Sequence, residues 1–310
     1  MSIKKISIIG SGNVGSNIAF LLLAKKLAAE INLIDIRPGL AKGIALDLED
    51  CRFFFKSNIS IRGGCNLALL KSSDIVVITA GKPRSPGMKR EDLIRINSGV
   101  LGEISKTIKK LSPKALVIVV TNPLDLMTYL VLKMTGFSSK RVLGMGSGLD
   151  SSRLANIIHK RLNLSFESIN PVVFSAHGKD MLVSDLTTAA GISLKGYFTG
   201  KEAKKIKDLT VNRGAEIVGE LKTGSARFAP ASACTDLIES IAEDKRKLSF
   251  VSVYLDGEYG LKNICMGVPV VIGAKGAEEI LEFKLPLKEK RMLKRTGESF
   301  RRQSAMLNNT

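Results

Sequence analysis

The chain has 310 residues, of which 45% are hydrophobic and 25% charged, and its formal net charge at pH 7 is +18. This composition excludes a disordered chain and is typical of a globular protein with two domains, each with its own core. Because no apolar run approaches the roughly 18 residues of a membrane span, we expect no membrane association. The four cysteines have neither the density of a disulfide scaffold nor the spacing of metal ligands, which predicts a cytoplasmic protein without a metal.

The excess of positive charge produces a field that attracts anions of every kind, nucleic acids and small substrates alike. The basic residues are dispersed along the chain, and tryptophan is absent from it. Proteins that bind single-stranded nucleic acid stack the bases on aromatic side chains. We therefore interpret the charge as a general field and do not expect specific nucleic-acid binding.

Short runs rich in Ile and Val alternate with helix-like stretches in the first half of the chain. The runs lie at residues 3–10, 30–36, 74–80, 115–121 and 141–145, and the helix-like stretches at 14–27, 39–50, 92–111 and 123–134. Such runs are typical of strands buried on both faces of a parallel sheet. The alternation predicts a doubly wound α/β sheet, a Rossmann domain, over residues 1–145. The basic and apolar start of the chain is interpreted as its first strand, not as a signal peptide.

The second half, residues 146–310, has a more mixed pattern. A helix is expected from residue 151 to 162, β-rich runs near 170–174 and 250–272, and a charged helical tail from residue 277. No linker rich in Pro or Ser separates the two halves. We therefore expect an α+β domain that packs closely on the first domain.

A glycine-rich turn joins the first expected strand to the first expected helix. Its residues are Gly10, Ser11, Gly12, Asn13, Val14 and Gly15. In this pattern the glycines permit a tight turn, the approach of a pyrophosphate to the backbone, and close packing of helix on strand. Asp35, 20 residues later, ends the second expected strand, where a carboxylate can accept both ribose hydroxyls of an adenosine. Together these features predict an NAD site, although Arg37 stands where an arginine could meet the 2′-phosphate of NADP.

The segment from residue 79 to 92 carries Arg84 and Arg90 among glycines and prolines. This composition predicts a loop rather than a helix face. A guanidinium presents a planar fork that matches a carboxylate, so two of them on one loop suit a small anionic substrate. A solvated basic loop is the alternative interpretation.

His177 follows a short apolar run and precedes a glycine, so we expect its imidazole to face a cleft and to exchange a proton near neutral pH. A hydrogen-bonded structural histidine is the alternative, and His159 is expected on the solvated edge of a helix. Asp150 and Arg153 stand at the start of the helix expected from residue 151. Asp150 either caps this helix or holds the imidazole in one tautomer, while Arg153 on the first turn would clamp a carboxylate. Asn122 ends the fourth expected strand, where α/β sheets bind ligands.

These features, in this order, resemble the lactate/malate dehydrogenase family over nearly the whole chain. The matching positions are the turn at 10–15, Asp35, residues 79–81 with Arg84 and Arg90, Asn97, and residues 121–125, 149–153, 177–178 and 224–231. The resemblance implies an NAD-dependent enzyme whose second domain binds the substrate. The implied catalytic residues are His177 and Asp150, and the implied substrate residues are Arg84, Arg90, Asn122 and Arg153. Further implied cofactor contacts are Asn97, Val120 and Asn122.

Within the family, lactate dehydrogenases carry Gln at the first position of this loop and malate dehydrogenases carry Arg. Arg84 therefore implies the reversible oxidation of (S)-malate to oxaloacetate, because pyruvate would leave a buried guanidinium without an anion. A lactate dehydrogenase and a weakly catalytic basic NAD-binding protein stay as alternatives. The family also implies a homodimer or homotetramer. One departure is Lys179, where the family has an acid, and a cation there would lower the pKa of His177.

Overall fold

The computed structural model describes residues 3–83 and 88–309. Six parallel strands form one half of its main sheet, in the order β3-β2-β1-β4-β5-β6. They are β1 Lys5–Ile9, β2 Glu30–Ile34, β3 Ser60–Gly64, β4 Ile75–Ile78, β5 Leu116–Val119 and β6 Val142–Gly144. The order reverses between β1 and β4, and open α/β sheets bind ligands beyond the carboxyl ends of strands at such a point. The expected doubly wound α/β sheet is confirmed.

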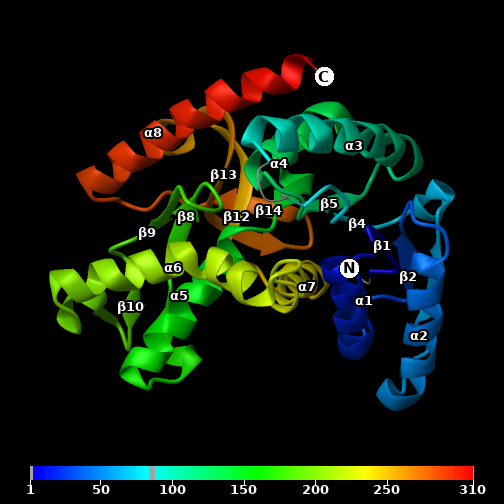
Figure 1. Ribbon diagram of the computed structural model, residues 1–310, viewed down its shortest axis with the longest axis horizontal. Coiled ribbons are helices and arrows are strands. Elements are labelled where there is room, and N and C mark those ends of the chain that lie inside the picture. Colours follow the sequence, from blue (N-terminus) through cyan, green and yellow to red (C-terminus); the bar gives the residue numbers. More distant parts are fainter. Residues whose placement is uncertain (1–2, 84–87, 310) are drawn as a thin grey trace.

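In the described part of the chain, four helices cover these strands. They are α1 Asn13–Lys25, α2 Leu40–Phe55, α3 Arg90–Leu111 and α4 Leu124–Thr135. α3 packs on α4 on one side of the sheet, and α1 packs on α2 on the other (Figure 1). Arg90 is the first residue of α3, so the prediction that it belongs to a loop was wrong. Glu91 and Asp92 in the first turn favour this start because they complement the positive end of the helix.

The strand β3 was missed by the sequence patterns. Ile61 is its one buried residue, Arg62 is exposed, and glycines follow at positions 63 and 64, so no apolar run marks the strand. A Cβ on Gly63 would lie 1.9 Å from the carbonyl oxygen of Ala41 on α2, so glycine allows this helix to cross the strand closely. β3 lies at the edge of the sheet, where a strand needs less apolar surface than a central one.

The second half of the chain extends the same sheet with antiparallel strands. β12 (Lys247–Asp256) pairs with β6 through Ser252 and Gly144, and with β13 (Lys262–Gly273) along its length. An eleven-stranded sheet of the described residues is completed by β8 Val173–Ser175, β9 Met181–Val183 and β14 Gly276–Ile280. A smaller sheet contains β7 Ile169–Asn170, β10 Thr188–Ala189 and β11 Ile192–Ser193.

The helices of the second half are α5 Ser147–Leu162, α6 Gly200–Leu221, α7 Phe228–Ala242 and α8 Leu287–Ser304. Short 3-10 turns lie at Leu67–Leu70, Ser139–Arg141, Phe166–Ser168, Leu194–Gly196, Glu258–Gly260 and Ala305–Asn309. The expected charged helical tail is present as α8, but its expected start at residue 277 was wrong, because residues 276–280 pair with β13 and the helix begins only after Pro286. None of the helices in the described ranges is both long and apolar enough to cross a membrane.

One apolar core runs through both halves. Buried side chains of β1, β4 and β5 belong to the same cluster as those of β12 and β13, while a smaller cluster joins α5, α6, β8 and β9. The domain boundary expected after residue 145 falls between β6 and α5. The division into residues 1–145 and 146–310 stays a prediction.

The first turn of α1 has no room for a side chain at Gly15, whose ideal Cβ would lie 1.9 Å from the carbonyl oxygen of Gly10. At Gly12, by contrast, the nearest atom of the described residues to a Cβ would be Nη2 of Arg37, at 3.9 Å. We predict that Gly15→Ala lowers the midpoint of thermal unfolding by roughly 2–5 °C, since forcing atoms into packed structure costs about 1–3 kcal/mol.

Gly12→Ala is the matched control and should change this midpoint by less than about 1 °C, as surface substitutions usually do. Thermal unfolding followed by circular dichroism measures both variants. Equal midpoints for Gly15→Ala and the unaltered chain would contradict the packing described for this turn.

Candidate active site

A buried carboxylate, Asp150, holds the centre of the site. Its Oδ2 accepts a hydrogen bond of 2.8 Å from Nδ1 of His177, and its Oδ1 accepts one of 3.0 Å from Nη1 of Arg153. Asp150 is fully buried in the first turn of α5, whose N-cap is Gly146. The alternative that Asp150 caps this helix was therefore wrong, because the helix begins four residues earlier than the sequence indicated.

His177 follows β8, and its side chain is 16% exposed. Because a carboxylate can only accept, Nδ1 carries the hydrogen of the bond to Asp150, which leaves Nε2 of the neutral ring free to accept a proton. A Cβ on Gly146 would lie 3.2 Å from Cβ of His177, so a glycine at the start of α5 lets the imidazole lie against it. The second histidine, His159, lies in the last turn of α5, and its Nδ1 is 2.7 Å from the backbone carbonyl oxygen of Leu164 rather than from a carboxylate.

A second carboxylate, Asp125, lies beside His177 and was not among the predicted site residues. Its Oδ2 accepts a 3.0 Å hydrogen bond from the backbone N–H of His177, and its Oδ1 accepts one of 2.7 Å from Ser252 on β12. Burial raises the pKa of Asp125, and these two hydrogen bonds offset only part of that rise. The available signal was its place at the end of the 121–125 segment, in the first turn of a buried helix.

The pKa of His177 is raised above its ordinary value. Burial lowers it, but the negative charge and hydrogen bond of Asp150 and the charge of Asp125 raise it by more, against the opposing charge of Arg153. The lowering expected from Lys179 is therefore not the net outcome. The physical reason is that Lys179 is exposed, whereas both carboxylates are buried next to the ring.

Arg153 lies in the second turn of α5, not in the first as the sequence indicated, and its side chain is 11% exposed. Its Nε is buried without a hydrogen-bond partner among the described residues. A Cβ on Gly214 of α6 would lie 3.5 Å from its Nη2. A guanidinium that uses one nitrogen for Asp150 keeps its other edge for an anion such as a carboxylate.

Asn97 links the ends of two strands at the carboxyl edge of the sheet. Its Oδ1 accepts a 2.7 Å hydrogen bond from the N–H of Lys82, and its Nδ2 donates one of 2.7 Å to the carbonyl oxygen of Asn122. Val120 is half-buried directly before Thr121 and Asn122, and its N–H donates to β4. The structure thus brings Asn97, Val120 and Asn122 together. Arg90 is half-buried at the start of the helix that carries Asn97, while Arg84 lies outside the described residues.

The glycine turn fits a dinucleotide. Gly10 adopts a φ of +100°, which favours glycine, and a Cβ there would lie 2.6 Å from the backbone N of Ala80. Among the described residues, no side chain caps the N-terminus of α1, so its first N–H groups can bind phosphate oxygens. Asp35 ends β2 beside this turn, and its Oδ2 accepts a 2.8 Å hydrogen bond from the N–H of Ser11. These residues would hold the pyrophosphate and the adenosine ribose of NAD.

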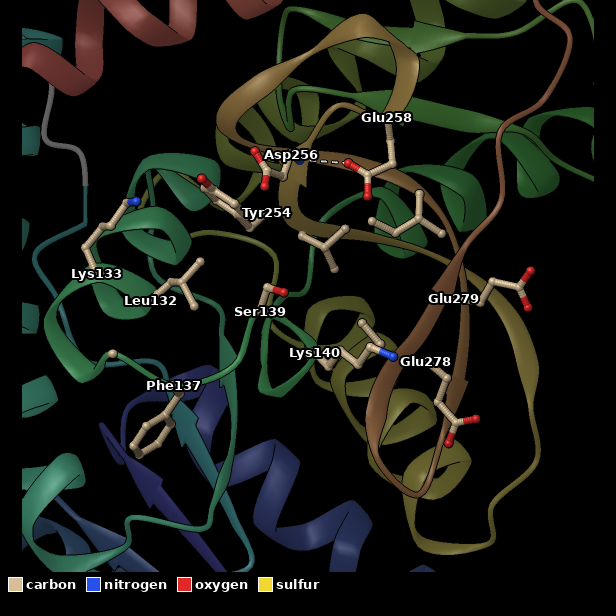
Figure 2. Close-up of a pocket in the computed structure, with 14 residues that line it drawn as sticks. Leu132, Lys133, Phe137, Ser139, Lys140, Tyr254, Asp256, Glu258, Glu278 and Glu279 are labelled. Carbon is tan, nitrogen blue, oxygen red and sulfur yellow. Dashed lines mark hydrogen bonds between the residues drawn. The ribbon is translucent and has the colours of Figure 1, made fainter.

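A separate cavity of about 510 Å³ opens at the amino ends of the parallel strands, near the start of β6 and opposite the carboxyl ends described above. Figure 2 shows Lys133 and Tyr254 on one side of it and Glu278 and Glu279 on the other. None of its lining residues belongs to the site around Asp150, so its size does not bear on the chemistry.

The whole chain matches one family of enzymes. Residues 4–144 match the model of the NAD-binding domain of lactate/malate dehydrogenases, and residues 147–306 match that of their α/β C-terminal domain. The chain belongs to the lactate/malate dehydrogenase family. A malate dehydrogenase of Sulfurimonas denitrificans is 41% identical over 299 residues, which cover 96% of this chain and 94% of that one.

A malate dehydrogenase and a lactate dehydrogenase from one organism are equally similar to this chain in backbone structure. The malate dehydrogenase of Cryptosporidium parvum is 36% identical, with a TM-score of 0.95 over 99% of this chain and 100% of that one. The lactate dehydrogenase of Cryptosporidium parvum, solved with lactic acid and NAD, is 33% identical, with a TM-score of 0.95 over 100% and 99%. Because the scores are equal, backbone similarity does not indicate which of the two substrates this chain binds.

The raised pKa of His177 gives a prediction for its titration. We expect a midpoint above 6.5 in the folded protein, and a lower midpoint in Asp125→Asn because one of the two carboxylates is lost. Since the pKa is raised by folding, the stabilisation is present below about pH 6.5 and is lost as the pH rises through the folded-state pKa. NMR titration of the imidazole resonances measures the midpoint, and His159→Gln assigns them.

Asp180→Asn is the matched control, because it removes one negative charge from an exposed position three residues after His177, where water screens it. Its midpoint should stay at that of the unaltered protein. A midpoint that is the same in Asp125→Asn and Asp180→Asn would show that Asp125 does not act on His177 through its charge.

Proposed function

We propose that this chain is an NAD-dependent malate dehydrogenase, which interconverts (S)-malate and oxaloacetate. The observation that carries the proposal is the buried Asp150, shared between the imidazole of His177 and the guanidinium of Arg153. One carboxylate thus places a proton acceptor next to an anion clamp, as the oxidation of a 2-hydroxy acid requires. Arg84 in the sequence selects the dicarboxylate within this class.

The reaction follows from these contacts. The C1 carboxylate of malate pairs with the free edge of Arg153, and Nε2 of His177 takes the hydroxyl proton. When bound, NAD supplies the ring that accepts the hydride from the same carbon. Asp150 stabilises the imidazolium that forms, and Arg90 stabilises the negative charge that develops on the substrate oxygen. In the reverse direction, His177 returns the proton to the carbonyl oxygen of oxaloacetate.

Arg84 is proposed to pair with the C4 carboxylate, which pyruvate lacks. A lactate dehydrogenase is the second candidate, because a lactate dehydrogenase superimposes on this chain as well as a malate dehydrogenase does. In that case the positive charge of Arg84 would have no partner in the substrate, and burying it would cost several kcal/mol. This asymmetry favours malate.

Arg84→Gln tests the substrate assignment. We predict that kcat/KM for oxaloacetate falls at least about 100-fold, since a charge-assisted pair with a carboxylate is lost, while kcat/KM for pyruvate holds or rises. Lys89→Gln, which removes one charge from the same segment, should leave both values nearly unchanged. Steady-state assays with NADH and each keto acid measure the effect.

An unaltered chain that prefers pyruvate would support the lactate alternative. Turnover of neither acid would support the basic NAD-binding protein. Equal losses for both acids in Arg84→Gln would remove Arg84 as the residue that distinguishes them.

We also propose that the chain forms a homodimer or homotetramer, in the cytoplasm. Large apolar side chains on α1 and α2 are exposed in the single chain: Phe20 by 41%, Leu46 by 54%, Phe53 by 71% and Phe54 by 78%. Exposed apolar clusters of this kind mark protein interfaces more often than free surface. The helices α1 and α2 are therefore the proposed contact.

Phe53→Glu combined with Phe54→Glu should lower the molar mass measured by light scattering to that of one chain, about 33.5 kDa. The control Ile192→Glu alters a side chain that is 53% exposed in the other half of the protein and should not change the mass. An unaltered protein that is monomeric at micromolar concentration would contradict the proposal.

A further inference from the structure

The guanidinium of Arg37 is hydrogen-bonded to the carboxylate of Asp35, which is proposed to bind the adenosine ribose. Its Nε lies 3.1 Å from Oδ1 of Asp35, and its Nη2 lies 3.4 Å from Oδ2. The backbone N–H groups of Arg37 and Ser11 donate to the same two oxygens, at 3.0 and 2.8 Å. Asp35 therefore accepts four hydrogen bonds, which is the full capacity of about four lone-pair sites on an ionised carboxylate.

Two ribose hydroxyls cannot reach Asp35 while all of these bonds are present. The two backbone donors belong to the turn and to the end of β2, so they stay in place. The guanidinium is the donor that can leave, because its side chain is 62% exposed and a solvated pair of this kind holds weakly. Binding of an adenosine ribose thus requires Arg37 to move away from Asp35.

The displaced guanidinium stays next to the ribose. It is attached two residues after Asp35, and its Nη2 already lies 3.9 Å from the place where a Cβ of Gly12 would be, above the phosphate-binding turn. The group most suited to such a planar cation is a phosphate, which accepts two parallel hydrogen bonds from it. A 2′-phosphate on the ribose would lie between Asp35 and this cation.

We propose that Arg37 forms a subsite for the 2′-phosphate of NADPH. Its guanidinium leaves Asp35 and binds this phosphate instead, so that the chain accepts NADPH as well as NADH. The inference rests on the proposed NAD site and does not depend on malate as the substrate. Asp35 still repels the phosphate, so NADH stays the preferred cofactor. Arg37 reduces this preference, and without it the chain would be selective for NADH.

Binding of adenosine nucleotides tests the subsite without catalysis. Isothermal titration calorimetry with 2′,5′-ADP and 5′-AMP compares ligands that differ only in the 2′-phosphate. We expect Arg37→Ala to weaken 2′,5′-ADP at least 10-fold and to leave 5′-AMP unchanged or tighter, because a competitor for Asp35 is removed. In kinetics, kcat/KM with NADPH should fall at least 10-fold, and kcat/KM with NADH should not fall.

Arg62→Ala is a matched control, since Arg62 is also 62% exposed and also lies near an acid of β2, with its Nη1 4.0 Å from Glu30 at the other end of the strand. It removes the same charge from the general field and should affect neither nucleotide selectively. Equal weakening of both nucleotides by Arg37→Ala, or the same selective weakening by Arg62→Ala, overturns the proposal. Failure to reduce oxaloacetate with either cofactor would contradict the proposed function and leave the calorimetric result to decide this inference.

Discussion

The arrangement of the active site depends on the hydrogen bonds that Asp150 accepts from His177 and Arg153 at the same time. A fully buried carboxylate is costly unless it is paired, so the fold must bring both partners to it. The sheet does this, because β12 joins β6 to β13 and β8 and so sets the start of α5 against the end of β8. Gly267 on β13 makes the contact possible, since a Cβ there would lie 1.9 Å from Oγ of Ser147.

The charges around His177 suit the proton exchange that we propose for its imidazole. Asp150 and Asp125 stabilise the imidazolium, and Arg153 limits that effect while presenting its free edge to an anion. The pKa of His177 is thereby raised, which favours the protonated form that reduction of a keto acid requires. The positive net charge of the chain adds a field that attracts anions at longer range.

Local patterns in the sequence predicted the central strands, the helices between them and the glycine turn, because each has a strong period or a turn that only glycine permits. They failed where the decisive contact is distant in the chain. Asp125 acts through partners 52 and 127 residues away, and no local pattern reports such a contact. The local sequence of β14 led to its interpretation as helix. Its pairing with β13, which is a tertiary contact, overrides that local preference. The pair between Arg37 and Asp35 was out of reach because it depends on the rotamer of an exposed side chain.

The chain uses the same pair of groups, a carboxylate and an arginine, at both ends of the proposed cofactor site, with opposite consequences. The pair of Asp150 and Arg153 is buried, with side chains 1% and 11% exposed, so breaking it would leave a charge uncompensated and the geometry persists. The pair of Asp35 and Arg37 leaves the arginine 62% exposed, and water can replace either partner at a cost of about 0–1 kcal/mol. Burial alone therefore suits one pair to be a fixed support for the proposed catalysis and the other to be the contact that we propose a ligand exchanges.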